Sequence, residues 1–343
     1  MPSGGAGKSV FFCALLAVTL APFALILGFA PHEAQLPGII FAANLTGGGH
    51  VASTLYLFGD PEFRPLVRRA WLRFVVAPLA LGAGFIIIGQ LAPTIWPGLF
   101  LAFFSWQVFH YQRQNYGIVS FAAKASGTRL PAQLSAALSA TVPVAILGVM
   151  ASRTTDLPAL GDPGALRLAG AALYAVAIAW IIVIVWRDPA ARRSPLVVAA
   201  AGCAALFFLP ALLSGSVLVV FWSYAIAHGA QYLLFMCVLA WTAPRRAISA
   251  SGLALAILGG LFFFAGLRSS FVQHFYLGIT CGHFLIDAKV WRLREMPQRA
   301  LIGRRFGFAL APPAPGARGS IASGEIGADG QLPLAARLGA GPG

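Results

Sequence analysis

Long apolar blocks, separated by short polar segments, make up most of this chain. The apolar residues run continuously instead of alternating with polar ones, and blocks of about 18 or more such residues indicate transmembrane helices. We therefore predict an all-α, polytopic transmembrane bundle of about ten spans. The blocks cover residues 10–30, 38–59, 72–92, 96–121, 132–150, 166–186, 195–213, 214–241, 247–267 and 270–292.

The basic residues of the connecting segments support this count and predict an orientation. Every second segment is rich in Lys and Arg, whereas the others hold only Arg153, Arg167 and Arg268. Because basic segments stay on the cytoplasmic side, both termini are expected there. The seventh and eighth blocks nearly meet at residues 213–215, which leaves nine or eleven spans open. The inside segments would hold Lys8, Arg64, Arg68, Arg69, Arg73, Lys124, Arg129, Arg187, Arg192, Arg193, Arg245 and Arg246.

Composition agrees with a membrane protein. Of the 343 residues, 59% are hydrophobic and 10% are charged, whereas a soluble domain carries about 25% charged residues. The net charge of +14 lies in short clusters between apolar blocks, which favours a topology signal over nucleic-acid binding. We expect the lipid bilayer as partner, no nucleic acid, and the cytoplasmic membrane of a bacterium as location.

The chain divides into three regions. Residues 1–9 are predicted to form a cytoplasmic tail, 10–295 the transmembrane domain, and 296–343 a cytoplasmic, largely disordered tail rich in Gly, Ala and Pro. The first block resembles a signal peptide but is long for one. Cleavage after Ala30 would place Pro31 at the scissile bond, so an uncleaved first helix is favoured over a cleaved one.

Four histidines lie inside predicted spans, where an ionisable group is costly without a partner. His50, His110, His228 and His283 occupy the second, fourth, eighth and tenth blocks, all of which run from outside to inside. They stand 12 (50 − 38), 14 (110 − 96), 14 (228 − 214) and 13 (283 − 270) residues into their blocks. A spread of two residues corresponds to about 3 Å along a helix. Imidazole is the commonest metal-ligand side chain, so this common depth predicts one shared metal ion.

Polar neighbours of the histidines are candidates for support or catalysis. Asp287 follows His283 by four residues, on the same helix face, and is expected to orient the imidazole or bind the metal. Arg113 needs a carboxylate partner at this depth, for which Asp287 is the best candidate. Tyr232 is the third candidate catalytic residue. Supporting residues are Thr54, Gln114, Gln231 and Tyr224, whereas His274 and His32 are second-tier candidates.

The step His228-Gly229-Ala230, together with four intramembrane histidines, resembles the Brp/Blh family. Those proteins are polytopic β-carotene oxygenases thought to hold non-haem iron with four histidines. The resemblance implies an iron-dependent oxygenase. Gln231-Tyr232 stands where that family has an acidic residue and a further histidine.

These observations favour a membrane metalloenzyme, a non-haem iron oxygenase or desaturase acting on a lipid or isoprenoid. Such an enzyme implies iron, a hydrophobic small-molecule substrate and an electron donor. Two alternatives stay open. One is an electron-transfer protein that binds haem through pairs of histidines. The other is a multi-pass transporter with a site formed by His228, Arg113 and Asp287.

The alternation of basic segments generates a test of topology. A reporter that is active only in the cytoplasm, fused to the C-terminal Gly343, is expected to be active because the predicted span count is even. The same reporter fused within the predicted outer segment near Arg153 is expected to be inactive. A C-terminal reporter that is active only outside the cell would contradict the orientation.

Overall fold

The computed structural model describes residues 5–29, 36–152, 162–214, 216–265, 269–292 and 295–310. These residues are helical with short turns and contain no strand, as the sequence predicts. Residues 1–310 belong to one compact unit. The tail 311–343, His32 and the junction between Ala30 and Pro31 lie outside the described residues.

Each of the ten predicted blocks coincides with a helical segment. Several segments are divided by a π-helical turn (η2, η3, η5) or by a short break. Along the chain they are α1 Gly5–Phe29; α2 Leu36–Ala43, η2 Asn44–Gly48, α3 Gly49–Ser53 and α4 Tyr56–Gly59; η3 Leu72–Val76 and α6 Ala77–Leu91; α7 Trp96–Ala125; α8 Ala132–Ala136, η5 Ala137–Thr141 and α9 Val142–Ala151; α10 Pro163–Arg187; α12 Pro195–Leu206 and α13 Pro210–Leu213; α14 Val217–Trp241; α15 Arg246–Ala265; and α16 Ser270–Val290. Four short elements connect them: α5 Arg64–Arg69, η4 Pro93–Ile95, α11 Pro189–Arg192 and α17 Met296–Arg305.

Six helices among the described residues are long and apolar enough to cross a membrane. They are Ala6–Gly28, Leu72–Leu91, Ala132–Met150, Pro163–Arg187, Pro195–Leu213 and Val219–Trp241. Arg246–Leu261 is a shorter apolar helix. The segments outside this group include three that carry predicted metal ligands. Residues 36–59 are divided among short helices, and α7 and α16 interrupt their apolar sequence with polar side chains.

Several helices begin at conventional capping residues. The side chain of Asp162 accepts a hydrogen bond from the backbone N–H of Ala165 at the start of α10. Ser194 and Ser216 cap α12 and α14 in the same way. A side-chain acceptor at this position satisfies one of the N–H groups that a helix start leaves free. The polar segments between apolar blocks therefore contribute the residues that start the next helix.

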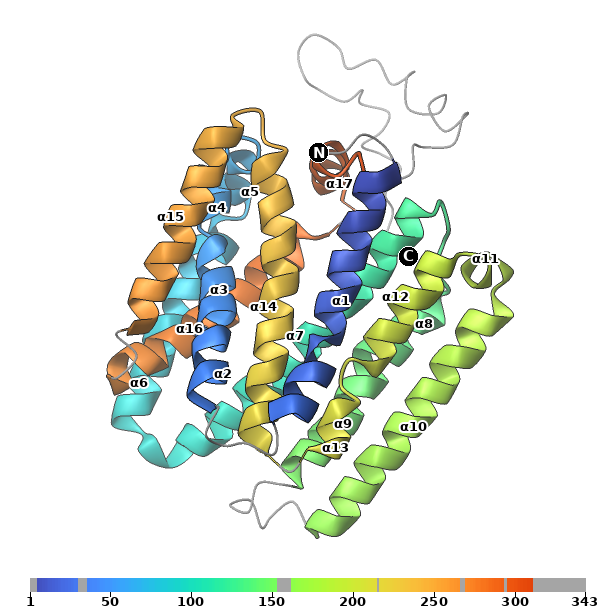
Figure 1. Ribbon diagram of the computed structural model, residues 1–343. Coiled ribbons are helices and arrows are strands. Elements are labelled where there is room, and N and C mark those ends of the chain that lie inside the picture. Colours follow the sequence, from blue (N-terminus) through green and yellow to red (C-terminus); the bar gives the residue numbers. More distant parts are fainter. Residues whose placement is uncertain are drawn as a thin grey trace, which may run out of the picture. The chain divides into compact units, whose positions relative to one another are not determined.

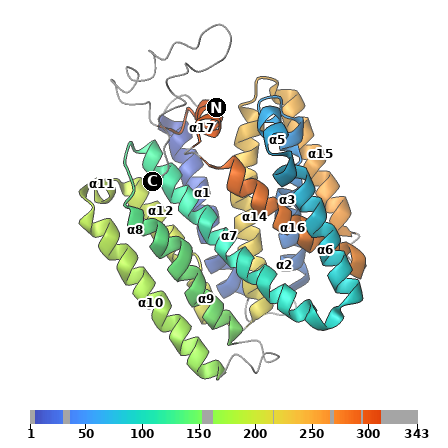
Figure 2. The ribbon, with the colours of Figure 1, turned by 180° about the vertical axis from the view of Figure 1, so that it is seen from behind.

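The helices α1, α7 and α14 lie in the middle of the bundle, between two sets of helices (Figures 1 and 2). On one side are α2 to α6, α15 and α16, and on the other are α8 to α13. Helix α14 packs against α1, α2, α3, η2 and α15. Consequently α14 joins the two sides, and its residues are available to both.

Glycines permit the closest helix contacts. A Cβ atom added to Gly278 would lie 2.4 Å from the carbonyl oxygen of Leu81, and one added to Gly282 would lie 2.5 Å from Cα of Pro78. These positions allow α16 to lie directly against α6. On the other face of the site, a Cβ on Gly229 would lie 2.5 Å from the carbonyl oxygen of Thr46. Small residues of this kind let helix backbones approach where lipid supplies no hydrophobic driving force.

The basic ends of the helices gather at one end of the bundle. Lys8 at the start of α1 donates a hydrogen bond of 2.5 Å to the carbonyl of Ala125 at the end of α7. Helix α17 packs at this end (Figure 1), with Ile302 and Phe306 buried. The folded unit thus continues to Leu310, beyond the predicted boundary at residue 295, because the apolar face of α17 covers the ends of the other helices.

Ionic contacts at both ends of α17 hold it in place. Arg305 is 4% exposed and contacts Asp60, which is 3% exposed, at 3.0 Å. Tyr56 donates a hydrogen bond of 2.7 Å to the same carboxylate. At the start of α17, the hydrogen bond from Lys289 lowers the pKa of Glu295 to about 2, so that this carboxylate is charged at neutral pH.

We predict that the buried pair between Arg305 and Asp60 stabilises the fold. Arg305→Ala leaves a buried carboxylate without its cation, which typically costs about 3–5 kcal/mol. The neighbouring Arg304 contacts Glu62 with its side chain 62% exposed, and Arg304→Ala is expected to cost about 0–1 kcal/mol. Thermal unfolding of the two variants in detergent measures the difference. Equal melting temperatures would contradict a stabilising role for the buried pair.

Candidate metal centre

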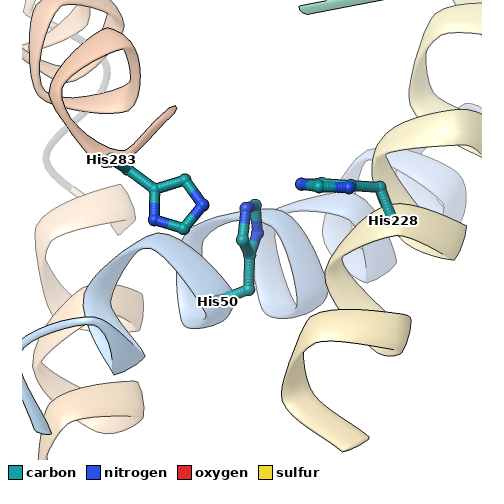
Figure 3. Close-up of side chains that lie close together, drawn as sticks. All are labelled: His50, His228 and His283. Carbon is teal, nitrogen blue, oxygen red and sulfur yellow. The ribbon is translucent and has the colours of Figure 1, made fainter. Parts of the chain in front are cut away.

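Three of the predicted histidines meet between α3, α14 and α16. The ring of His50 stands between the rings of His283 and His228 (Figure 3), with ring centroids 4.8 Å apart in both pairs. One ligand atom from each of the three lies within 4.8 Å of the others. All three side chains are buried. Helices far apart in the sequence therefore place three imidazoles around one point.

The fourth histidine approaches the same cluster from α7. The ring centroid of His110 lies 4.9 Å from that of His228 and 5.8 Å from that of His283. Asp287 completes the group, with Oδ2 lying 3.3 Å from Nε2 of His283 and 3.6 Å from Nε2 of His110. We refer to His50, His110, His228, His283 and Asp287 together as the histidine cluster.

Atoms of the histidine cluster that face inward lack hydrogen bonds. Within the part of the chain that the structure describes, the buried atoms without a partner include Nε2 of all four histidines, Nδ1 of His228 and Oδ1 of Asp287. A buried polar atom without a partner costs roughly 1–3 kcal/mol, and native proteins rarely tolerate one. So many in one place indicate a ligand-binding site made of two overlapping groups, His50, His228 and His283, and His110, His283 and Asp287.

Hydrogen bonds on the far side of two rings fix their orientation. Nδ1 of His50 lies 3.2 Å from the carbonyl oxygen of Thr46. A carbonyl only accepts, so Nδ1 carries the proton and the lone pair of Nε2 is free. Nδ1 of His283 is hydrogen-bonded to Oγ1 of Thr54 at 2.8 Å. This arrangement, in which the outer nitrogen is held and the inner one is free, is the usual environment of metal-binding histidines.

The local sequence explains how His50 and His228 come together. The π-helical turn η2 immediately precedes His50 and contains Gly47 and Gly48, and π-helical turns often occur at functional sites. Gly229 lets α14 rest against the backbone of this turn at Thr46. The same carbonyl of Thr46 accepts the hydrogen bond from His50. The glycine that follows His228 therefore has a structural purpose at the site.

An amide network supports the helix that carries His228. Nε2 of Gln114 donates to the backbone carbonyl of His228 at 3.2 Å and to Oε1 of Gln231 at 2.8 Å. Nε2 of Gln231 in turn donates to Thr19 and Asn115. Gln114 and Gln231 thus hold the backbone of α14 and contact no imidazole ring by these bonds. Asn115 belongs to the network but was not singled out from the sequence.

Aromatic side chains enclose the cluster. Phe284 stacks on His110 with ring centroids 4.1 Å apart, and Tyr111 lies against His228 at 4.3 Å. Sequence reasoning missed both, although each directly follows a predicted ligand in the chain. Tyr232 is buried, and its ring lies 5.1 Å from His283 and 5.5 Å from His50. Its hydroxyl has no hydrogen-bond partner among the described residues.

Three predicted residues lie away from the cluster. Arg113 is exposed and forms no ion pair within the described residues, so its predicted pairing with Asp287 is wrong. Arg113 follows His110 by three residues, so its side chain is rotated about 60° around the axis of α7 from that of His110. This rotation turns the guanidinium group away from the cluster. Tyr224 accepts a hydrogen bond from the backbone of Ala211 and packs between Phe207 and Phe208.

His274 also lies elsewhere, near the start of α16. Its ring is 4.1 Å from that of Trp96, and it fills the space beside Gly89. Nine residues separate it from His283, which is about 13 Å along a helix. This second-tier candidate of the sequence analysis therefore lies outside the histidine cluster.

The geometry of the cluster is suited to a metal ion. Nitrogen and oxygen ligands bind transition metals at about 2.0–2.2 Å, so neighbouring ligands of one ion lie about 3 Å apart. The separations of 3.3 and 3.6 Å from Asp287 to two histidines approach this value. Imidazole nitrogens and a carboxylate are ligands that divalent transition metals bind. These buried histidine groups could therefore bind a metal ion.

No protein-family model, curated protein or solved structure matches this chain. The resemblance to the Brp/Blh family is therefore carried only by the residues quoted for it above. Function has to be inferred from the chemistry of the site itself.

We predict that the cluster histidines are required for metal binding. Changing His50, His110, His228 or His283 to Ala should remove most of the metal from the purified protein, because each substitution deletes one ligand. His274→Ala is the matched control, since it removes a buried histidine outside the cluster and should leave the metal content unchanged. Inductively coupled plasma mass spectrometry measures both. Retention of metal by two or more of the four variants would contradict a shared site.

Proposed function

We propose that this protein is an integral membrane metalloenzyme, a non-haem iron oxygenase or desaturase that acts on a lipid or isoprenoid. The single observation that supports this most strongly is the buried cluster of four histidines and one carboxylate whose inner atoms have no partner. Five nitrogen and oxygen ligands would suit iron and still leave a sixth position for a substrate or dioxygen. The surrounding helices bring a hydrophobic substrate directly from the bilayer.

The proposal includes ten spans with both termini in the cytoplasm. The ten helical segments of the bundle and the collection of basic residues at one end support it. Arg64, Lys124, Arg192 and Arg245 are exposed at segment ends that the alternation assigns to one side. Three ligand-bearing segments are outside the group of helices that are long and apolar enough to cross a membrane. Their ligand-bearing faces would point inward, and the other helices would shield them from lipid.

The chain's own residues supply the environment for oxygen chemistry. Phe284 and Tyr111 cover two imidazole faces and exclude water from the cluster. Thr46 and Thr54 hold two rings in the orientation that presents Nε2 inward. Bound iron would supply the one-electron steps that dioxygen requires. Desaturation reduces one dioxygen to two waters, with two electrons from the substrate C–H bonds and two from an external donor.

The two alternatives have less support. A haem places a planar macrocycle between two axial imidazoles, but the ring of His50 already stands between His228 and His283 (Figure 3). The transporter alternative depends on Arg113 as partner of Asp287, and Arg113 is exposed. Neither alternative explains why Nε2 of four neighbouring histidines is buried without a hydrogen bond.

The proposal predicts iron and oxygen consumption. The protein, purified in detergent and reconstituted with ferrous iron, is expected to hold about one iron per chain. With a chemical reductant and a membrane lipid extract that includes isoprenoids, it should take up dioxygen and yield an oxidised or desaturated lipid, detected by mass spectrometry. His228→Ala is the inactive control.

Two results would count against this function. A strong haem absorption band in the freshly purified protein would favour the electron-transfer alternative. Stoichiometric zinc, with no dioxygen uptake after replacement by iron, would show that the cluster is a metal site of another kind.

A further inference from the structure

Tyr232 contacts two rings of the histidine cluster and, on its other side, an aromatic ring outside it. Among the described residues it is the one readily oxidised side chain with both kinds of contact. It is 2% exposed, and its ring meets those of His50 and His283 edge to face. Its hydroxyl lacks a hydrogen bond of good geometry, although the carboxylate of Asp287 and the hydroxyl of Thr54 are close by. The ring of Tyr232 and its hydroxyl therefore both lie against residues of the site.

On its other side Tyr232 contacts Trp291. The two rings are 6.2 Å apart, centroid to centroid, and lie nearly perpendicular. Trp291 is the residue that ends α16, and it is partly exposed. The chain His283, Tyr232, Trp291 thus leads from the buried cluster to the surface through side chains in direct contact. Tyrosine and tryptophan are the aromatic side chains that lose an electron most easily.

The other aromatic side chains around the cluster form no comparable chain of oxidisable rings to the surface among the described residues. Tyr111 touches His228, but its ring contacts only histidines among the described aromatic pairs. Trp106 is 38% exposed and reaches the cluster only through Phe284, which is not readily oxidised. The route through Tyr232 and Trp291 therefore differs from the general aromatic packing of the bundle.

Trp291 ends α16 and directly precedes the segment that leads to α17 at the basic end of the bundle. Its neighbour Arg292 is 38% exposed, and Arg304 on the adjacent α17 is 62% exposed. Exposed basic residues on α5 and α11 lie at the same end (Figure 1). Such a surface attracts an acidic partner by charge complementarity. The same end faces the cytoplasm in the proposed topology, where soluble one-electron carriers are available.

We propose that Tyr232 and Trp291 form an electron relay between the histidine cluster and an acidic one-electron carrier that docks at the basic end. This inference rests on the proposed function. One electron would pass from Tyr232 to a centre that dioxygen or peroxide has oxidised beyond the ferric state, while the phenol O–H bond breaks and its proton moves to the carboxylate of Asp287. Trp291 then returns an electron to the tyrosyl radical, and the proton returns with it. The carrier re-reduces Trp291, so that the net change is one electron from carrier to centre.

The test compares relay variants with matched controls in the iron-loaded, full-length protein. Iron content is measured first. The ferric protein is oxidised further with peroxide and then mixed in a stopped-flow instrument with a reduced plant-type ferredoxin, an acidic one-electron carrier, and the return of the ferric signal is followed. Trp291→Phe and Tyr232→Phe are expected to slow reduction at least several-fold with iron content unchanged. The control Trp106→Phe, which changes a partly exposed tryptophan outside the relay, should reduce at the wild-type rate.

Further readouts separate a relay from a structural role. In wild-type protein the rate should fall as ionic strength rises, because docking is electrostatic. Peroxide treatment of the ferric protein should produce an organic radical in electron paramagnetic resonance spectra that Tyr232→Phe abolishes. Trp291 contacts no histidine of the cluster. If the Trp291→Phe variant holds the full amount of iron and is reduced at the wild-type rate, the relay is overturned and the proposed function is not. A wild-type protein that binds no iron overturns the proposed function, and the relay with it.

Discussion

The need to partner polar atoms in an interior that excludes water governs this structure. In an apolar bundle an imidazole, an amide or a guanidinium group has to find its hydrogen bonds or ionic contacts inside the protein. Outside the histidine cluster this need is largely met. Gln114 and Gln231 satisfy one another and the backbone of α14, and Arg305 meets Asp60. Single atoms such as Nε of Arg305 also lack a partner, but the histidine cluster is the exception because several such atoms gather there, among the described residues.

Close backbone contacts determine where that exception is located. Gly229 brings α14 onto the π-helical turn η2, while Gly278 and Gly282 bring α16 onto α6. These contacts fix the helices that carry His228, His50 and His283 with little freedom to slide. Rigid elements of this kind hold ligands within the narrow limits that a metal ion requires. The same turn both receives Gly229 and orients His50 through the carbonyl of Thr46.

The two ends of the bundle differ in a way that matters for function. At the basic end, α17 covers the helix ends with Ile302 and Phe306, and the buried contact between Arg305 and Asp60 secures it. In the proposed orientation the basic residues there face the cytoplasm, where they would attract the proposed acidic carrier. At mid-depth, aromatic rings separate the cluster from lipid. A hydrophobic substrate and an electron donor would thus approach from different directions, one from the bilayer and one from the cytoplasm.

The sequence by itself determined much of the architecture. Apolar blocks located all ten helical segments, because the length of a block and its composition are local properties. The common depth of His50, His110, His228 and His283 followed from their positions along those blocks. The spacing of four residues placed Asp287 beside His283, since helical periodicity alone sets that contact. The side of the membrane on which each end lies was also inferred from the sequence and stays a prediction.

Only the tertiary structure decided which helix each face meets. Thr54 was expected to support His50 from its own helix, but it is hydrogen-bonded to His283 on α16. Arg113 and Tyr224 have the right depth or spacing and yet face away from the cluster. Tyr111, Phe284 and Trp291 acquire their roles from contacts between helices far apart in the sequence. Periodicity fixes a residue's height and angle on its own helix, but the neighbour across the interface depends on how whole helices pack, and single glycines such as Gly229 control that packing.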